Sequence, residues 1–280
     1  MASNVVRHPA VAGRFYSRDP EDLRTEVGGY LSLEASNQSN STTLAPARAV
    51  GCIAPHAGYV YSGHVAGAVF ATIEIPRRCI VLCPNHTGMG RALAIMSEGA
   101  WETPLGEVPI DDELAAALKR RFPALQEDSA AHRAEHAVEV ELPFLQTLQP
   151  ELTFVPIALG TTQLEILEQL GLALADVIAS RHEPVLIVAS GDMNHYESDV
   201  VTRAKDHRAI ERILTLDPRG LHEVVMQQKI SMCGLGPAVA MLTAGRQLGA
   251  KSAELVKYAT SGDVSGDREM VVGYAGVVVR

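Results

Sequence analysis

Three histidines follow apolar, strand-like runs of the sequence in the same way. His56, His86 and His195 each stand in the first turn after such a run, beside Gly, Pro or Asn residues that allow a tight backbone turn. Because ligands bind at the carboxyl ends of parallel strands in an open α/β sheet, we expect the three imidazoles to converge at one edge. Imidazole is both a common metal ligand and a general acid or base, so this edge predicts metal binding or proton transfer.

Cys233 is a fourth candidate, because it lies among small residues just before a helical pattern that begins near Gly236. Free amides at a helix N-terminus can lower the pKa of a cysteine thiol, and the thiolate is the form that binds metals. The residues alone leave two alternatives open, a nucleophile paired with a histidine and an inert thiol. The remaining cysteines lie in β-branched runs, where a thiol usually serves as a small buried hydrophobe: Cys52, Cys79 and Cys83.

Acidic residues and one more histidine extend this set. Asp192 stands three residues before His195, close enough to orient an imidazole or a metal-bound water. His136 and Glu139 are three residues apart in a predicted helix, so they share one face, which points either into the cleft or into solvent. The other histidines lack comparable turns and are interpreted as structural or solvated: His8, His64, His132, His182, His207 and His222.

The elements that must position these residues alternate along the chain. Apolar runs predict strands at 48–55, 79–84, 92–96, 152–159, 184–189, 254–259 and 271–279. Helical patterns lie at 20–33, 63–73, 111–121, 135–148, 163–180, 200–214, 218–228 and 236–248. The alternation predicts an α/β fold whose mostly parallel sheet is flanked by helices on both faces. We expect one domain over residues 1–280, with a flexible polar loop near 35–45.

Composition excludes several classes of function. The chain of 280 residues is 47% hydrophobic, enough to fill one large core, and its net charge of -9 argues against a nucleic-acid partner. No apolar run reaches the ~18–20 residues of a membrane-spanning helix, and the N-terminus lacks the order of a secretion signal. We therefore expect a cytoplasmic protein with no membrane partner. The glycine-rich phosphate-binding motifs are missing as well, so no nucleotide cofactor is expected.

Several motifs in the same order resemble the Memo family, whose bacterial and archaeal members are also called AmmeMemoRadiSam system protein B. They are Ile-Ala-Pro-His56-Ala-Gly-Tyr59, Pro-Asn-His86, Glu-His136-Ala-Val-Glu139, Ser-Gly-Asp192-Met-Asn-His195 and Met-Cys233-Gly. The similarity extends over nearly the whole chain, from residues 12–16 to residues 272–274. It implies a fold like that of the LigB-type extradiol dioxygenases, which are non-haem iron(II) enzymes that open catechol rings with O2.

The resemblance also implies roles for individual residues. His56, His86 and Cys233 match the family's metal-binding positions and imply a mononuclear site. The resemblance implies catalytic or cleft positions for three more residues: His195 as acid or base, His136 as a substrate-holding histidine, and Asp192 as an acid beside the metal. We assign substrate binding to two further residues, Tyr59 and Glu139.

The third metal ligand departs from the dioxygenases, which have a carboxylate where this chain has Cys233. A thiolate is softer and itself oxidisable, so the set accepts iron or copper, with zinc also possible. The leading hypothesis is a dioxygenase-like, metal-dependent oxidoreductase acting on an unidentified small molecule. The alternatives are a non-catalytic redox-metal-binding or docking protein, with the AMMECR-type and radical SAM partners that the family name implies, and a metal-dependent hydrolase.

Overall fold

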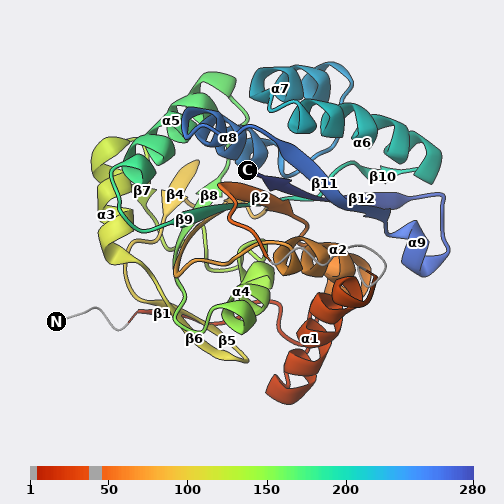
Figure 1. Cartoon of the computed structure of the whole chain (residues 1–280), viewed down its shortest axis with the longest axis horizontal. Helices are drawn as coiled ribbons and strands as arrows, with labels where there is room; N and C mark the ends of the chain where they lie inside the picture. The colour runs from red at the N-terminus through yellow and green to blue at the C-terminus, as the bar shows by residue number, and fades with distance from the viewer. Residues whose placement is uncertain (1–4, 38–45) are drawn as a thin grey trace.

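The computed structural model describes residues 5–37 and 46–280 (Figure 1), and its centre is a nine-stranded sheet. Four neighbouring strands form a parallel core: β2 (Gly51–Ala54), β9 (Val185–Ser190), β3 (Arg78–Pro84) and β8 (Thr153–Leu159). Antiparallel strands extend both edges of this core: β4 (Leu93–Ile95) on β8, β12 (Val271–Val279) on β2, and β11 (Ala253–Thr260) and β10 (His195–Glu197) on β12. A two-residue strand, β7 (Gln126–Glu127), runs parallel to β4.

All seven strands predicted from the sequence are present, with bounds shifted by at most a few residues. Sequence patterns did not predict β7, β10 or the second, three-stranded sheet of β1 (Val6–Arg7), β5 (Ala100–Thr103) and β6 (Gly106–Pro109). These strands have two to four residues each, too few for an alternating pattern to be recognised.

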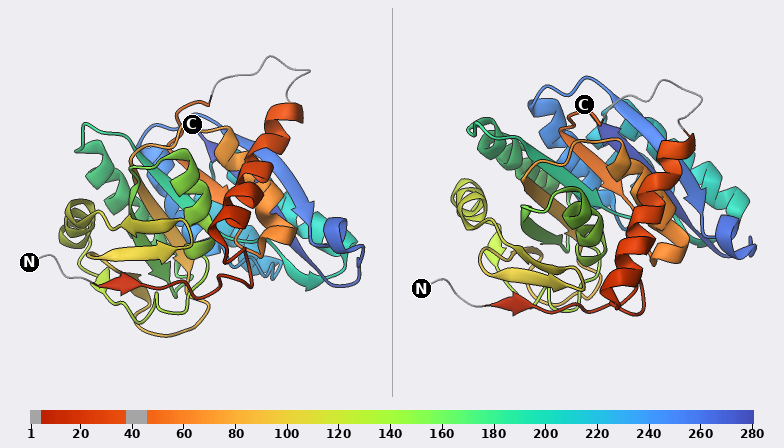
Figure 2. Two further views of the ribbon diagram at one scale, coloured as in Figure 1. Left: turned by 90° about the horizontal axis from the view of Figure 1, so that it is seen from below. Right: turned by 60° about the horizontal axis from the view of Figure 1, so that its bottom comes forward.

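Helices cover both faces of the large sheet, as predicted (Figures 1 and 2). One face carries α1 (Pro20–Asn37), α2 (Tyr59–Ala71) and α4 (Leu142–Leu148). The other carries α3 (Asp112–Arg121), α5 (Leu164–Ala179), α6 (Asp199–Leu214), α7 (Pro218–Gln227) and α8 (Leu235–Gln247). A short helix, α9 (Gly262–Ser265), follows β11. Helix α1 runs to Asn37, so it takes in the start of the loop predicted at 35–45, and residues 38–45 lie outside the described residues.

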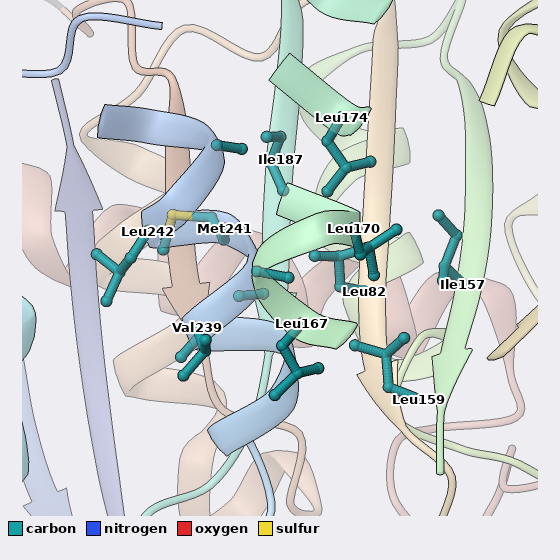
Figure 3. Close-up of a cluster of buried hydrophobic side chains, with 14 of the residues drawn as sticks. Leu82, Ile157, Leu159, Leu167, Leu170, Leu174, Ile187, Val239, Met241 and Leu242 are labelled. Carbon is teal, nitrogen blue, oxygen red and sulfur yellow. The ribbon is translucent and has the colours of Figure 1, made fainter. Parts of the chain in front are cut away.

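The central strands are buried on both faces. Along β3, Ile80 and Leu82 pack toward α5 and α8, whereas Cys79, Val81 and Cys83 pack toward the α2 and α4 side. Figure 3 shows the first of these layers, with leucines of α5 and apolar residues of α8 lying over β3, β8 and β9. A one-residue slip of a strand would exchange its two faces, so packing fixes the register that positions the strand ends.

The helix predicted over 135–148 is wrong in its first half. The segment before Glu139 is irregular, a 3-10 turn spans Glu139–Glu141, and α4 begins only at Leu142. Pro143 explains the late start, because proline lacks an amide proton and is tolerated in the first turn of a helix but not in its interior. His136 therefore lies on a loop rather than on a helix face. In the parts of the chain that the structure describes, no helix is long and apolar enough to cross a membrane.

Candidate metal centre

The ends of three neighbouring parallel strands bring the candidate residues together. His56 and His86 each stand two residues beyond the end of their strands, β2 and β3, and Asp192 stands two residues beyond β9, which lies between them. The amide of His56 donates a hydrogen bond of 2.9 Å to the Asp192 carboxylate. Cys233 reaches the same place from the loop that joins α7 to α8.

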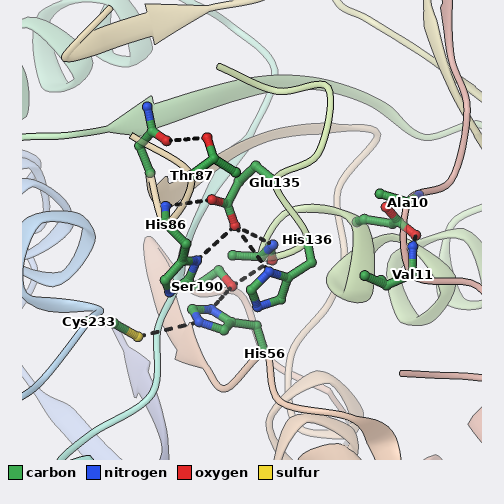
Figure 4. A network of polar contacts seen from close by, with 12 residues as sticks. Ala10, Val11, His56, His86, Thr87, Glu135, His136, Ser190 and Cys233 are labelled. Atoms are coloured by element: carbon green, nitrogen blue, oxygen red, sulfur yellow. Dashed lines mark hydrogen bonds and ion pairs between the residues drawn. The ribbon is translucent and has the colours of Figure 1, made fainter. Parts of the chain in front are cut away.

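The donor atoms of His56, His86 and Cys233 fit one metal ion. One ligand atom from each lies within 4.8 Å of the other two, and His56 Nε2 is 3.4 Å from Cys233 Sγ. Zinc-type bonds of ~2.0–2.1 Å to nitrogen and ~2.3 Å to sulfur place two tetrahedral ligands about 3.5 Å apart. Figure 4 shows Cys233 pointing at the His56 ring, with His86 and His136 around them.

Glu135 orients His86. Its carboxylate accepts hydrogen bonds from His86 Nδ1 (2.9 Å) and from the His86 amide (2.7 Å), so Nε2 is the nitrogen left for a metal. Burial is the largest single influence and would raise the pKa of Glu135, but the hydrogen bond and charge of His86, the Ala137 amide and His136 together outweigh it and lower the pKa to about 2. Burial likewise opposes the charged form of His86, yet the contact with Glu135 raises its pKa above the usual value. Carboxylate, imidazole and metal in series is the usual arrangement of a ligating histidine.

Ser190 orients His56 in the same way. His56 Nδ1 lies 2.9 Å from Ser190 Oγ, which directs Nε2 toward Cys233. Only 2% of His56 is exposed, and burial together with the neighbouring His86 lowers its pKa to about 3. The ring is therefore neutral at physiological pH, as metal binding requires.

The Cys233 thiol has a raised pKa, contrary to the prediction of stabilisation by a helix N-terminus. Burial is the main cause, and the nearby Asp192 carboxyl adds to it. The amide that points at Sγ comes from Asp192, at 3.3 Å, rather than from α8, which begins two residues after Cys233. Burial also raises the pKa of Asp192. A bound cation would favour both anions, so the electrostatics of the site suit a metal.

Two glycines allow the loop of Cys233 to approach the sheet. Gly191 and Gly234 pack backbone to backbone, and a Cβ on Gly191 would lie 2.2 Å from the Gly234 Cα. The reverse contact, from a Cβ on Gly234 to the Gly191 Cα, is 2.6 Å. Both distances are far below those that real side chains tolerate. The Ser-Gly-Asp and Cys-Gly motifs can therefore pack this closely only with glycine at both positions.

Two more histidines border the metal ligands. A ring nitrogen of His195 lies within 4.8 Å of Asp192 and Cys233, and its Nδ1 is 2.8 Å from the Ser231 carbonyl. His136 stacks on His86 with ring centroids 4.8 Å apart, and burial and the neighbouring His56 lower its pKa to about 4. The structure therefore brings both histidines, with Asp192, beside the proposed ligands.

Tyr59 and Glu139 do not reach the site, which corrects their assignment to substrate binding. Tyr59 is buried in the core against Phe144, and its hydroxyl donates to the Val140 carbonyl at 2.6 Å. Glu139 is buried and faces the N-terminal segment, where it pairs with Arg7 and accepts the Tyr16 hydroxyl. Because Glu139 lies in a 3-10 turn that follows an irregular segment, it does not share a helix face with His136.

Three buried residues that support the candidate ligands escaped the sequence interpretation: Glu135, Ser190 and Glu141. Each is fully buried and lies one or two hydrogen bonds behind a proposed ligand. One signal was present in the sequence, since Glu135, Glu139 and Glu141 interrupt a stretch that is otherwise rich in apolar residues. Buried carboxyl groups are rare without a partner, so acids inside an apolar run indicate a specific use.

We predict that Gly191→Ala weakens metal binding at least about tenfold, because the new methyl group pushes the Cys233 loop away from His56. Zinc titration against a competing chelator measures the change. Gly29→Ala is the matched control, since a Cβ there meets nothing within 4 Å. Equal zinc affinity in Gly191→Ala and Gly29→Ala would show that the close packing of Gly191 against Gly234 does not position the thiol.

We predict that the metal dissociation constant rises about tenfold per unit fall in pH between about pH 8 and pH 6. The raised pKa keeps Cys233 a thiol in the metal-free protein, so binding must release its proton, whereas His56 with a pKa of about 3 releases none. The raised pKa of His86 makes the dependence steeper at the acid end. Proton release in a weakly buffered zinc titration checks this, and a dissociation constant that stays the same between these pH values would contradict it.

We predict that Tyr59→Phe lowers the free energy of unfolding by about 1 kcal/mol and leaves metal affinity unchanged. The substitution leaves the buried Val140 carbonyl without the Tyr59 hydroxyl and touches no ligand. Urea unfolding of the metal-free protein and zinc titration of the folded protein measure the two effects. A change in metal affinity at unchanged stability would restore Tyr59 to the site.

The chain is similar to known proteins over nearly its whole length. The family model described as Memo-like protein matches residues 7–278. A MEMO1 family protein of Methanopyrus kandleri is 44% identical over 279 residues, 98% of this chain and 99% of that protein, and one of Methanothermobacter thermautotrophicus is 42% identical over 274 residues, 97% and 99%.

A solved structure, that of an uncharacterized protein from Escherichia coli K12, shares the fold. Its TM-score is 0.56 at 14% sequence identity, and the match covers 82% of this chain and 100% of that one. The structural match speaks for the fold alone, whereas the family model and the two relatives extend over nearly the whole length of the chain. The chain belongs to the Memo-like protein family.

Proposed function

We propose that the protein binds one redox-active metal ion, iron or copper, through His56, His86 and Cys233 and oxidises a small molecule beside it, with O2 or a reactive oxygen species as the electron acceptor. The observation that carries the proposal is the position of His195. Its ring reaches within 4.8 Å of Cys233 and Asp192, while Nδ1 is engaged by the Ser231 carbonyl. This arrangement leaves Nε2 as a base close to the metal ligands, and a structural or storage site does not need one.

The ligand set favours redox chemistry. Two imidazoles and a thiolate are soft enough for copper and acceptable to iron, and three protein ligands leave room for an exogenous ligand. Zinc also fits these donors but supplies no electron transfer. Bound iron or copper would supply the electron transfer and the activation of oxidant that the protein side chains cannot provide.

The surrounding residues transfer protons, position a ligand and bind the substrate. His195 accepts and returns a proton at Nε2, and the buried Asp192 fixes the His56 backbone and balances positive charge. His136 holds the substrate on the side of His86, to which it is stacked. The side chains of His86 and His136 are 32% and 22% exposed, whereas that of His56 is 2% exposed. Substrate therefore enters over His86 and His136.

One observation favours a second candidate function, a non-catalytic protein that stores or delivers redox metal. Four of the surface cavities in the described part of the chain, of ≈ 390 to ≈ 560 Å³, are lined by residues other than the proposed ligands. A small-molecule enzyme usually keeps such a cavity beside its reacting centre. In this case AMMECR-type and radical SAM proteins would be the partners. They would either receive the metal or dock on the protein.

The test begins with metal analysis of protein purified without added metal. We expect about one equivalent of iron or copper in the native chain. The metal should be lost in His56→Ala and Cys233→Ser and kept in His195→Gln, which leaves the three ligands intact. His182→Ala is the control for a surface histidine, because His182 is exposed at the opposite end of β9. Absence of metal in the native chain after anaerobic reconstitution would contradict the ligand assignment.

Oxygen consumption with a panel of catechols, thiols and ascorbate then separates the two functions. We expect turnover by the loaded protein and a loss of roughly 10²-fold in His195→Gln, the size of effect that removing a general base produces. Stoichiometric metal with no turnover on any substrate, and no difference between native and His195→Gln protein, would favour storage or delivery.

A further inference from the structure

Glu141 is a buried carboxyl group that the proposed chemistry does not use. Its exposure is 0%, and none of the ion pairs within the described parts of the chain includes it. One carboxyl oxygen, Oε1, lies 2.8 Å from Ser190 Oγ, and the other, Oε2, has no hydrogen-bond partner. The ionisable groups that face it are Asp192, Cys52 and Tyr59, and none of them is a cation. An ionised carboxylate here would carry an uncompensated charge in the core.

The hydrogen bonds around Ser190 determine how many protons this cluster holds. Ser190 Oγ has three partners within bonding distance: His56 Nδ1 at 2.9 Å, the Ala137 carbonyl at 2.7 Å and Glu141 Oε1 at 2.8 Å. Each contact needs its own proton. The Ala137 carbonyl can only accept, so the single Ser190 hydroxyl proton belongs to that contact. The other two protons must then come from His56 Nδ1 and from Glu141.

If Glu141 were ionised, there would be too few protons for the three contacts of Ser190 Oγ. Only the His56 and Ser190 protons would remain for three contacts, and one pair of oxygens within 2.8 Å of each other would have no proton between them. If His56 carried its proton on Nε2 instead of Nδ1, its contact with Ser190 Oγ would bring no proton, and one of the three contacts would again lack one. All three contacts are satisfied only when Glu141 is neutral and His56 carries its proton on Nδ1.

We propose that Glu141 is a neutral carboxylic acid that holds His56, through Ser190, in the tautomer that presents Nε2 to the metal. Glu141 is thus a positioning residue for the site. The proposal rests on the metal site proposed above and adds the state of its buried support. Burial raises the pKa of Glu141, and Asp192 adds to this, in agreement with the proton count.

The two histidine ligands are then supported by opposite means. His86 donates to Glu135, an ionised carboxylate that makes its imidazole a stronger electron donor. His56 donates to a hydroxyl group whose own partner is a neutral acid, so its imidazole keeps ordinary donor strength. A neutral Glu141 also avoids adding a further negative charge to a site that already contains Glu135, Asp192 and Cys233.

Infrared spectroscopy of the metal-free protein tests the protonation state of Glu141 directly. We expect a protonated carboxyl band, above the amide I region, that is present in the native protein at neutral pH and missing from Glu141→Gln. The amide of glutamine can donate to Ser190 Oγ as the acid does, so this variant keeps the fold, and thermal unfolding checks that it does. Histidine ¹⁵N NMR of the native protein, with His56 assigned by its loss in His56→Ala, should show protonated Nδ1 and bare Nε2.

Zinc affinities of matched variants test the consequence for the site. Glu135→Gln and Glu141→Gln make the same change behind the two histidine ligands. We expect Glu141→Gln to stay within about threefold of native affinity, since it removes no charge, and Glu135→Gln to lose roughly 10–100-fold. Ser190→Ala should also lose about tenfold or more, because His56 Nδ1 then has no acceptor.

The results separate failure of this proposal from failure of the proposed function. Absence of an infrared band that disappears in Glu141→Gln, or a zinc affinity of Glu141→Gln that falls as far as that of Glu135→Gln, would overturn the neutral acid. A His56 ring protonated at Nε2 in the metal-free protein would overturn its tautomer. Failure of the native protein to bind metal would overturn the proposed function, while the infrared and NMR measurements would still decide the state of Glu141 and His56.

Discussion

The parallel pairing of β9 with β2 on one side and β3 on the other controls the geometry of the candidate metal centre. Ala54 is opposite Ser190, and Leu82 is opposite Ala189, so the residues that follow these strands leave the sheet side by side. The Gly191 amide extends the ladder by donating to the Ala54 carbonyl at 2.9 Å. Since both faces of these strands are buried by helices, the register is rigid. His56, Asp192 and His86 therefore meet at distances set by strand spacing, and the loops have little freedom to move them.

Burial then sets the charge of each group. A carboxyl group at this edge is an anion where a hydrogen-bonded imidazole can share its charge, as for Glu135, and its pKa is raised where only neutral or acidic groups face it, as for Glu141. Cys233 and Asp192 lie between these cases, with pKa values raised by burial and no protein cation at bonding distance. A metal ion bound here would supply the missing positive charge, and its binding and the deprotonation of the thiol would then be one equilibrium.

The sequence predicted what depends on patterns of several residues. Seven long apolar runs gave seven strands, and the turns after three of them located His56, His86 and His195, because strand direction in an α/β sheet is nearly fixed by the alternation with helices. The predictions for Tyr59 and Glu139 failed for a different reason. Their orientation depends on where α2 and α4 begin and on Arg7, which pairs with Glu139 from 132 residues away in the chain. Periodicity carries no information about such a distant partner.

The supporting residues show why candidate ligands can be proposed from sequence when the hydrogen bonds behind them cannot. Ligands must be of a few residue types after particular turns, and Cys233 differs from the other three cysteines because it lies among small residues rather than in a β-branched run. By contrast, Ser190 and Glu141 act only through the protons they share. The apolar neighbours of Glu141 in the sequence indicate that this acid has a specific use, but they do not name its partner. The asymmetry between an ionised carboxylate behind His86 and a hydroxyl group behind His56 appears only when the hydrogen bonds are counted. For a thiolate-ligated metal this asymmetry matters, because the donor strength of each imidazole adjusts how much electron density the sulfur must supply.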